Sequence, residues 1–218
     1  MILIFGAGGH AKVIIDLVEK EGSHNIFGLI DPSKKKGDDL MGYKILGQES
    51  DLPGIIANNS IKGGVIAIGD NGLRQKVNDK ILRTCPNFNF FSFVHPSASI
   101  GKGVEVGAGS VILAGAIINT DSRIGNHCIL NTNSSLDHDA EMHDFSSLAP
   151  NSTVGGNVKI GEFSSISLGA NIIQNITIGK HALIGAGSVV VEDIKDFSVN
   201  YGVPSKFIRN RKKDEKYI

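Results

Sequence analysis

The chain has 218 residues, and its 22 Lys and Arg residues balance its 22 Asp and Glu residues, so the formal net charge is zero. Nucleic-acid-binding proteins usually carry a basic excess, which argues against that class. No uninterrupted apolar run approaches the roughly 18 residues of a membrane span. The apolar N-terminus has no basic segment ahead of it, so we expect no signal peptide. The two cysteines, Cys85 and Cys128, are expected to be reduced thiols of a cytoplasmic protein.

The N-terminal part has the pattern of a βαβ unit. Residues 1–5 form a continuous apolar run that ends at a Gly-rich turn, Gly6-Ala-Gly-Gly-His10. A helical pattern with one apolar face begins at Ala11, and a second apolar run, residues 26–30, ends at Asp31. Such a unit places backbone N–H groups at the N-terminus of its helix, where anionic groups bind.

Further elements complete this domain. Residues 34–42 are polar and loop-like, residues 65–68 form a third buried strand, a helix runs from about 72 to 84, and residues 90–94 form a fourth short strand. We therefore predict that residues 1–92 form a small, Rossmann-like parallel α/β domain with its strand ends facing one side.

The Gly-rich turn allows two kinds of ligand. Its spacing, Gly6-x-Gly8-x-x-Ala11, partly matches the dinucleotide fingerprint, and Asp31 stands where a ribose-binding acid would be. However, the domain has only four predicted strands, and no separate catalytic domain of the usual oxidoreductase kind follows it. We favour a nucleotide-sugar site over an NAD site, because a nucleoside diphosphate uses the same helix N-terminus. A third interpretation is that the glycines only permit a tight turn.

The second part of the chain repeats every six residues. From Val94 to Val190, each of the seventeen residues at this spacing is aliphatic or Met, and a row of mostly small residues follows four positions later. A period of six fits neither a helix nor a single strand. It fits a chain that turns a corner after every short strand, so that three hexads form an 18-residue coil. We predict a parallel β-helix over residues 93–194, a little over five coils and roughly 25 Å tall.

Glycine often follows the large aliphatic residue, and we expect it to serve corners with unusual backbone angles. The seven positions are Gly101, Gly107, Gly125, Gly155, Gly161, Gly179 and Gly185.

The hexads stop after Val190, and residues 195–218 form a C-terminal tail. It contains Gly202-Val-Pro-Ser-Lys206 and then a basic stretch, residues 209–213. The basic residues could help neutralise phosphates of a coenzyme, but we favour a solvated, frayed terminus.

The repeats resemble those of the hexapeptide acyltransferases, which wind as a left-handed β-helix, and Gly202-Val-Pro-Ser-Lys206 resembles the segment that closes over their coenzyme A. With the opening Phe5-Gly-Ala-Gly-Gly-His10, the chain resembles one group in particular. This group is the sialic-acid O-acetyltransferase and nucleotide-amino-sugar N-acetyltransferase family of bacillosamine and perosamine biosynthesis. The resemblance implies acetyl-CoA as co-substrate, no metal, a role in glycan biosynthesis, and a cytoplasmic homotrimer with active sites between neighbouring β-helices.

The resemblance also implies a catalytic base. The family's motif is a His followed by an acid, a few residues after a Leu-Asn-Thr stretch, and here these are His138 and Asp139. Imidazole has a suitable pKa for taking a proton from an attacking amine near neutral pH. Asp137 and Glu141 are local competitors for the orienting role of Asp139. The remaining histidines of the repeats, His127, His143 and His181, are expected to be ordinary surface residues, as is His24 in a loop.

Binding residues follow from the same resemblance, position by position. The nucleotide-sugar contacts are assigned to Gly8, Gly9, His10, Asp31, Pro32 and Gly69. The contacts to coenzyme A are assigned to backbone groups near Ser147, Gly156, Leu168 and Ala186, since backbone amides can bind a thioester oxygen whatever the side chain.

Two positions depart from the family pattern. Many members have a second His where Ser147 stands, so that contact near the thioester is in doubt. Many have a second Asp where Pro32 stands, which leaves uridine, guanosine and thymidine carriers open.

The leading functional hypothesis is an acetyl-CoA-dependent N-acetyltransferase that acetylates the amine of a nucleotide-linked amino deoxysugar by direct transfer. The main alternative is O-acetylation of sialic acid or a related nonulosonate. An NAD-dependent oxidoreductase and a non-enzymatic sugar-nucleotide-binding scaffold are less favoured. The sequence does not choose between the sugars, the nucleotide carriers or the glycans that receive the product.

Overall fold

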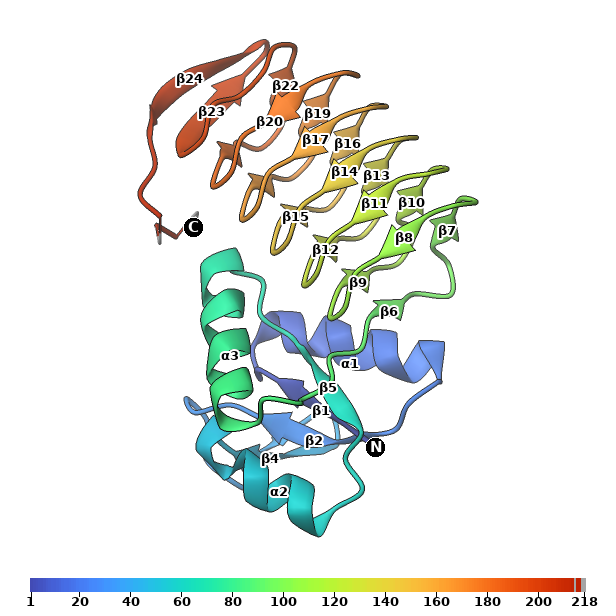
Figure 1. The fold of residues 1–218 in the computed structure, drawn as a ribbon, viewed down its shortest axis with the longest axis vertical. Coiled ribbons are helices and arrows are strands. Elements are labelled where there is room, and N and C mark those ends of the chain that lie inside the picture. Colours follow the sequence, from blue (N-terminus) through green and yellow to red (C-terminus); the bar gives the residue numbers. More distant parts are fainter. Residues whose placement is uncertain (214, 217–218) are drawn as a thin grey trace. The chain divides into compact units, whose positions relative to one another are not determined.

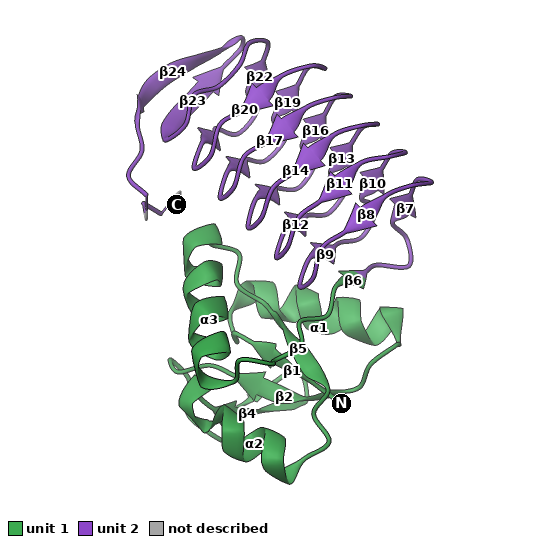
Figure 2. Ribbon diagram, viewed as in Figure 1, with its two compact units in different colours: residues 1–93 green, residues 94–218 purple. Residues whose placement is uncertain are grey.

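The computed structural model describes residues 1–213, 215 and 216, and these divide into two compact units (Figures 1 and 2). Unit 1 is Met1–Phe93 and unit 2 begins at Val94. The division lies one residue from the predicted boundary between residues 92 and 93. Residues 214, 217 and 218 of the predicted tail are outside the described part. Within that part, no helix has the length and apolar character needed to cross a bilayer.

Unit 1 is built on one five-stranded sheet with the strand order β3-β4-β2-β1-β5. The strands are β1 (Ile2–Phe5), β2 (Ile26–Ile30), β3 (Asp39–Leu40), β4 (Tyr43–Gly47) and β5 (Gly63–Ile66). All neighbours run parallel except β3, which pairs antiparallel with β4. Because β4, β2, β1 and β5 are parallel, their carboxyl ends meet at one edge of the sheet.

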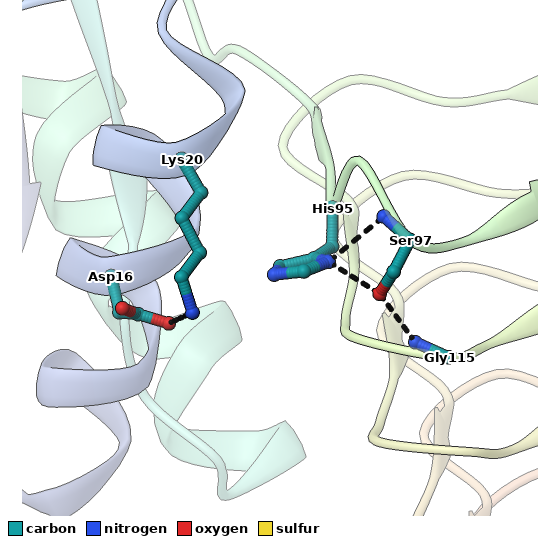
Figure 3. A network of polar contacts seen from close by, with 5 residues as sticks. All are labelled: Asp16, Lys20, His95, Ser97 and Gly115. Atoms are coloured by element: carbon teal, nitrogen blue, oxygen red, sulfur yellow. Dashed lines mark hydrogen bonds and ion pairs between the residues drawn. The ribbon is translucent and has the colours of Figure 1, made fainter.

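Three helices and one 3-10 turn complete unit 1. They are α1 (Gly9–Glu21), the turn Glu49–Asp51, α2 (Leu52–Asn58) and α3 (Asn71–Thr84). α1 buries the apolar stripe that the sequence predicts, and it ends at Gly22, whose φ of 76° costs glycine little. Its exposed side carries an ion pair between Asp16 and Lys20 at 2.8 Å (Figure 3), a contact that contributes about 0.3–0.5 kcal/mol.

The structure differs from the predicted elements of unit 1 in three places. The third strand, expected over residues 65–68, is β5 and runs from Gly63 to Ile66. The single strand expected over residues 90–94 is wrong, because Phe90 forms only an isolated bridge to Gly64 and Phe93–Val94 is a separate strand, β6, in a sheet of the β-helix. Strands β3 and β4 and helix α2 were not predicted. They are short, and β4 has only two fully apolar residues in sequence, Ile45 and Leu46.

Unit 2 is a parallel β-helix whose three faces are sheets of two-residue strands, with two longer strands, β23 and β24, at the C-terminal end (Figure 1). The first sheet, which we call sheet D, contains β7 (Ser99–Ile100), β10 (Ile117–Ile118), β13 (Ser135–Leu136), β16 (Thr153–Val154), β19 (Asn171–Ile172) and β22 (Val189–Val190). Sheet E contains β8 (Glu105–Val106), β11 (Arg123–Ile124), β14 (Glu141–Met142), β17 (Lys159–Ile160) and β20 (Thr177–Ile178). Sheet C contains β6 (Phe93–Val94), β9 (Val111–Ile112), β12 (Ile129–Leu130), β15 (Ser147–Leu148), β18 (Ser165–Ile166), β21 (Leu183–Ile184), β23 (Ser198–Gly202) and β24 (Ser205–Asn210).

The 18-residue coil is confirmed by the register of these strands. Leu136, for example, pairs with Ile118 on one side and with Val154 on the other. The large aliphatic residues from Ile112 to Val190 are buried and form one continuous core. Each such side chain contributes about 2 kcal/mol through removal of its apolar surface from water.

The start of the β-helix is tied to its second coil by a hydrogen-bonded group (Figure 3). The ring of His95 accepts from the N–H of Ser97 at 3.1 Å and lies 2.7 Å from its hydroxyl oxygen. That oxygen accepts from the N–H of Gly115, one coil further, at 3.1 Å. These contacts fix the first turn where the repeat begins.

The seven glycines that follow the large aliphatic residues do not have the predicted unusual backbone angles. Positive φ values occur two residues later in the hexad, for example at Asp121 (58°) and Asp139 (57°). The glycines are needed for a different reason, namely close approach of the next coil. A Cβ atom on Gly155 would lie 2.7 Å from the backbone nitrogen of Gln174, which no real side chain tolerates.

His127 and His181 are not surface residues, contrary to the prediction. They lie in a stack of five rings along one corner, which we call the ring ladder: His127, Phe145, Phe163, His181 and Phe197. Successive ring centroids are 4.6–5.4 Å apart with their planes within 14° of each other. Only 5% of His127 and 8% of His181 is exposed, because rings one coil apart cover each other.

The C-terminal segment is also more ordered than predicted. β23 and β24 form an antiparallel hairpin that extends sheet C through β21. The N–H of Arg211 donates to the carbonyl of Phe197 at 2.7 Å, and its guanidinium donates to the carbonyl of His181. The prediction of a frayed terminus is therefore wrong for residues 209–211, whose backbone is held against the last coils.

Candidate active site

A pocket of about 410 Å³ lies at the carboxyl ends of β1, β2, β4 and β5 in unit 1. All six residues assigned to the nucleotide sugar line it: Gly8, Gly9, His10, Asp31, Pro32 and Gly69. This is the edge at which open parallel sheets bind their ligands. α1 begins here without a side-chain cap on Gly8, so no side chain occupies the N–H groups of its first turn.

Asp31 has a structural role at this edge. One oxygen of its carboxylate accepts from the N–H of Ala7 at 2.7 Å, which ties the Gly-rich turn to the end of β2. The other oxygen accepts from the N–H and the hydroxyl of Ser33 at 2.8 and 2.7 Å. Asp31 therefore fixes the shape of the pocket wall as well as lining it.

His10 brings a neutral ring to the pocket. Burial, with a smaller effect from the charge of Arg74, lowers the pKa of His10 to about 4, so the ring carries no charge at neutral pH. Its Nε2 atom is buried and has no hydrogen-bond partner among the described residues. Arg74 itself donates to the carbonyls of Ile68 and Gly69 at 2.9 and 3.0 Å, which holds the end of β5 in place.

The sequence did not point to every residue of this pocket. Glu49, which follows the unpredicted strand β4, lines it and is 3% exposed. Lys80 of α3 donates to its carboxylate at 2.7 Å. Glu49 could have been found from the sequence only if β4 had been predicted, because the acidic residue then stands at the carboxyl end of a strand. Leu73 and Val77 of α3 add apolar surface.

His138 lies on an exposed corner of the β-helix, in the turn between β13 and β14. Its Nδ1 atom is 2.8 Å from Oδ2 of Asp139. A carboxylate accepts from Nδ1–H, so this contact leaves the lone pair on Nε2 available as a base. The backbone of Asp139 is in the left-handed region, with a φ of 57°.

The three acidic residues near His138 make different contacts, and Asp139 is the one whose carboxylate is bonded to the ring. Asp137 does not contact the ring; its Oδ1 accepts from the backbone N–H of His138 at 2.8 Å. Glu141 instead approaches His143 at 3.9 Å and Lys159 at 3.6 Å. The hydrogen bond from His138 to Asp139 raises the pKa of His138, and the charge of Asp137 raises it further.

Gly156 gives the imidazole its space. It occupies the position of His138 one coil further along, and a Cβ atom there would lie 2.7 Å from both Cε1 and Nε2 of the ring. Real side chains do not approach this closely, so any other residue at 156 would displace the base.

The other residues assigned to coenzyme A lie on a different part of the β-helix. Ser147 is on β15 in sheet C, and its hydroxyl is 3.2 Å from that of Ser165. Leu168 and Ala186 occupy the same position in the two turns that follow β18 and β21 of sheet C, and 57% of Leu168 is exposed. His138 and Gly156 follow strands of sheet D. A single chain therefore does not bring the two groups together.

Among the described residues, no group of three or more His, Cys, Asp or Glu side chains could hold a metal ion. Neither Cys85 nor Cys128 forms a disulfide. In Cys128 the sulfur lies 3.2 Å from the carbonyl of His143 in the core of the β-helix.

Known proteins share both the N-terminal domain and the β-helix of this chain. Residues 1–81 match the family model of the PglD N-terminal domain. The crystal structure of PerB from Caulobacter crescentus, in complex with CoA and GDP-perosamine, superimposes with a TM-score of 0.88 and 35% identity, over 95% of this chain and 97% of that chain. The chain belongs to the nucleotide-amino-sugar N-acetyltransferase family.

Two further members of this family show the same likeness. The acetyltransferase domain of PglB from Neisseria gonorrhoeae matches with a TM-score of 0.86 and 28% identity, over 95% of this chain and 98% of that chain. The UDP-N-acetylbacillosamine N-acetyltransferase of Bacillus subtilis is 31% identical over 115 residues, 52% of this chain and 51% of that enzyme. The matched segment thus spans about half the length of this curated relative. The fold expected from the sequence, an α/β domain followed by a left-handed β-helix, is confirmed.

Proposed function

We propose that the protein transfers the acetyl group of acetyl-CoA to the amine of a nucleotide-linked amino deoxysugar, with His138 as the general base. The observation that carries the proposal is the contact of His138 with Asp139 on an exposed corner, with Nε2 left free. The family supports the substrates, since PerB is described with CoA and GDP-perosamine and the Bacillus relative is named for acetylating a UDP-linked amino sugar.

The chemistry follows from the base. The sugar amine attacks the thioester carbonyl carbon, a C–N bond forms, and Nε2 of His138 takes a proton from the nitrogen. The C–S bond then breaks, and the coenzyme leaves as a thiol after the imidazolium returns the proton to sulfur. Asp139 holds the ring in the reactive tautomer and stabilises the imidazolium. No acyl-enzyme is needed, because the amine is itself a sufficient nucleophile.

The nucleotide-sugar pocket is proposed to be the one at the carboxyl ends of the strands in unit 1. The N-terminus of α1, which has no side-chain cap, fits a diphosphate, and the neutral ring of His10 can donate or accept one hydrogen bond at the pocket wall. The backbone near Gly156, Leu168 and Ala186 is proposed to hold coenzyme A. Ser147 is assigned to the same side, where its hydroxyl replaces an imidazole found in many members.

A homotrimer is proposed to complete the active site. His138 and Gly156 follow sheet D, whereas Ser147, Leu168 and Ala186 belong to sheet C or its turns. In the proposed trimer, a neighbouring copy of the chain brings these two groups to one site. We propose that the enzyme works in the cytoplasm in glycan biosynthesis, where acetyl-CoA and nucleotide sugars are both supplied.

The test is a CoA-release assay with a panel of nucleotide-linked amino sugars and, in parallel, free nonulosonates such as sialic acid. Turnover of an amino sugar that is lost in His138→Ala, with the trimer intact in sedimentation, is the expected result. Turnover of nonulosonates alone would replace the proposal with O-acetylation. Activity of His138→Ala within a few-fold of wild type would remove the base assignment. Binding of NADH but not of nucleoside diphosphates to unit 1 would favour an oxidoreductase.

A further inference from the structure

The turn that carries His138 is held by a second polar contact, which comes from the preceding coil. Asn119 and Asp137 stand at the same position in successive coils, each directly after a buried aliphatic residue of sheet D. The side-chain amide of Asn119 donates to Oδ1 of Asp137 at 2.6 Å. The same oxygen accepts from the backbone N–H of His138 at 2.8 Å.

This pairing fixes the peptide on which the base is mounted. The backbone N–H of Asp137 donates to the carbonyl of Val154, and its own carbonyl accepts from the hydroxyl of Ser122 at 2.7 Å. The main chain of Asp137 is thus hydrogen-bonded to the coils before and after it. Its side chain, which accepts from the backbone N–H of His138, holds the His138 peptide to this fixed segment. An imidazole on a fixed peptide loses less rotational freedom when it accepts a proton.

The carboxylate also supplies charge. The hydrogen bond from Asn119, followed by that from the N–H of His138, lowers the pKa of Asp137, so it is ionised at neutral pH. Asp137 and Asp139 are the two carboxylates that act on His138. Asp139 acts through a direct hydrogen bond to the ring, whereas Asp137 acts through its charge and through the backbone.

We propose that Asn119 and Asp137 are positioning residues of the acetyl transfer: the carboxylate of Asp137, held by Asn119, fixes the peptide of His138 and adds a second negative charge that stabilises its imidazolium. This proposal rests on the assignment of His138 as the base. It adds a second carboxylate, and an amide from another coil, to the pair of residues that the sequence indicates.

The experiment measures the pKa of His138 directly by NMR titration of the imidazole signals, in wild type, Asp137→Asn and Asn119→Ala. The signal of His138 is assigned by its absence from His138→Asn. Asp144→Asn is the matched control, because Asn126 donates to Asp144 from one coil away, through its backbone N–H at 2.7 Å and its side-chain amide at 3.3 Å, at a corner that carries His143 and not His138. We expect the pKa of His138 to fall in Asp137→Asn, to change less in Asn119→Ala, and to stay unchanged in Asp144→Asn.

Kinetics on the acetyl acceptor provide a second readout. In Asp137→Asn we expect kcat to fall about tenfold, the size of one lost charge-assisted hydrogen bond, with the acidic limb of the pH profile moved to lower pH and KM for acetyl-CoA unchanged. A His138 pKa in Asp137→Asn equal to that in the Asp144→Asn control would overturn the proposal. If wild type acetylates no nucleotide sugar, the proposed function fails, and the titration still decides whether Asp137 acts on His138.

Discussion

The uncharged state of His10 makes the stability of unit 1 depend on pH. In the folded chain its pKa is about 4, whereas in the unfolded chain an unperturbed His has a pKa near 6.5. Between these values the unfolded state binds a proton and the folded state does not. Stability is therefore fully present above about pH 6.5 and is lost as the pH falls toward 4.

The size of this effect follows from the linkage relation. Between pH 7 and pH 5 the two pKa values give a loss of about 2 kcal/mol from His10 alone. Other groups titrate in the same range, so the measurement compares wild type with His10→Asn, which keeps a polar group and cannot be protonated. We expect wild type to lose about 2 kcal/mol more than the variant over this interval.

The assay is urea unfolding at both pH values, followed by the helical circular dichroism signal. That signal reports unit 1, because α1, α2 and α3 all lie there within the described residues. An equal loss of stability in wild type and His10→Asn would refute the argument, and would mean that the ring gains a compensating partner when it is protonated.

Three further predictions concern unit 2. Because the pKa of His138 is raised and the neutral ring is the base, kcat/KM should rise with pH through a value above 6.5, and in Asp139→Asn this limb should move to lower pH with a large fall in kcat. Gly156→Ala should displace the imidazole of His138 and lower kcat at least tenfold, while the melting temperature in calorimetry changes little. The dissociation constant for CoA then shows whether the proposed contact between coenzyme A and the backbone of residue 156 survives. Phe145→Ala should lower the unfolding free energy by about 3 kcal/mol, and Phe145→Leu by clearly less, in calorimetry at fixed protein concentration. Equal losses would mean that ring stacking, which both variants remove, and not apolar burial carries the contribution of Phe145.

Periodicity predicted the β-helix because one physical constraint repeats at every coil. Each large aliphatic residue has to reach the same interior, so the six-residue period predicts the strand register, as the pairing of Leu136 with Ile118 and Val154 shows. The outward-facing positions have no such constraint. His127 and His181 were therefore mistaken for surface residues, although aromatic rings spaced 18 residues apart, at 127, 145, 163 and 181, were visible in the sequence.

Residues of the candidate site could be predicted from the sequence only where they belong to a recognisable motif. Gly8, His10 and Asp31 were expected at one pocket, and the structure places them there. Glu49 was missed because it follows a strand too short to stand out. The role of Asn119 could not be read from its own neighbourhood, since its partner is 18 residues away and the contact depends on stacked coils.

The strict pairing of each strand with those one coil before and after it also limits how this chain can vary in length. One residue inserted inside a strand would shift all later aliphatic side chains by one position and point them at water. Extra residues can be accommodated at a corner, where they loop outward, or as a complete additional turn of 18. The β-helices of related chains should therefore differ in length by complete coils or by loops at the corners, and hardly ever by a single residue within a strand.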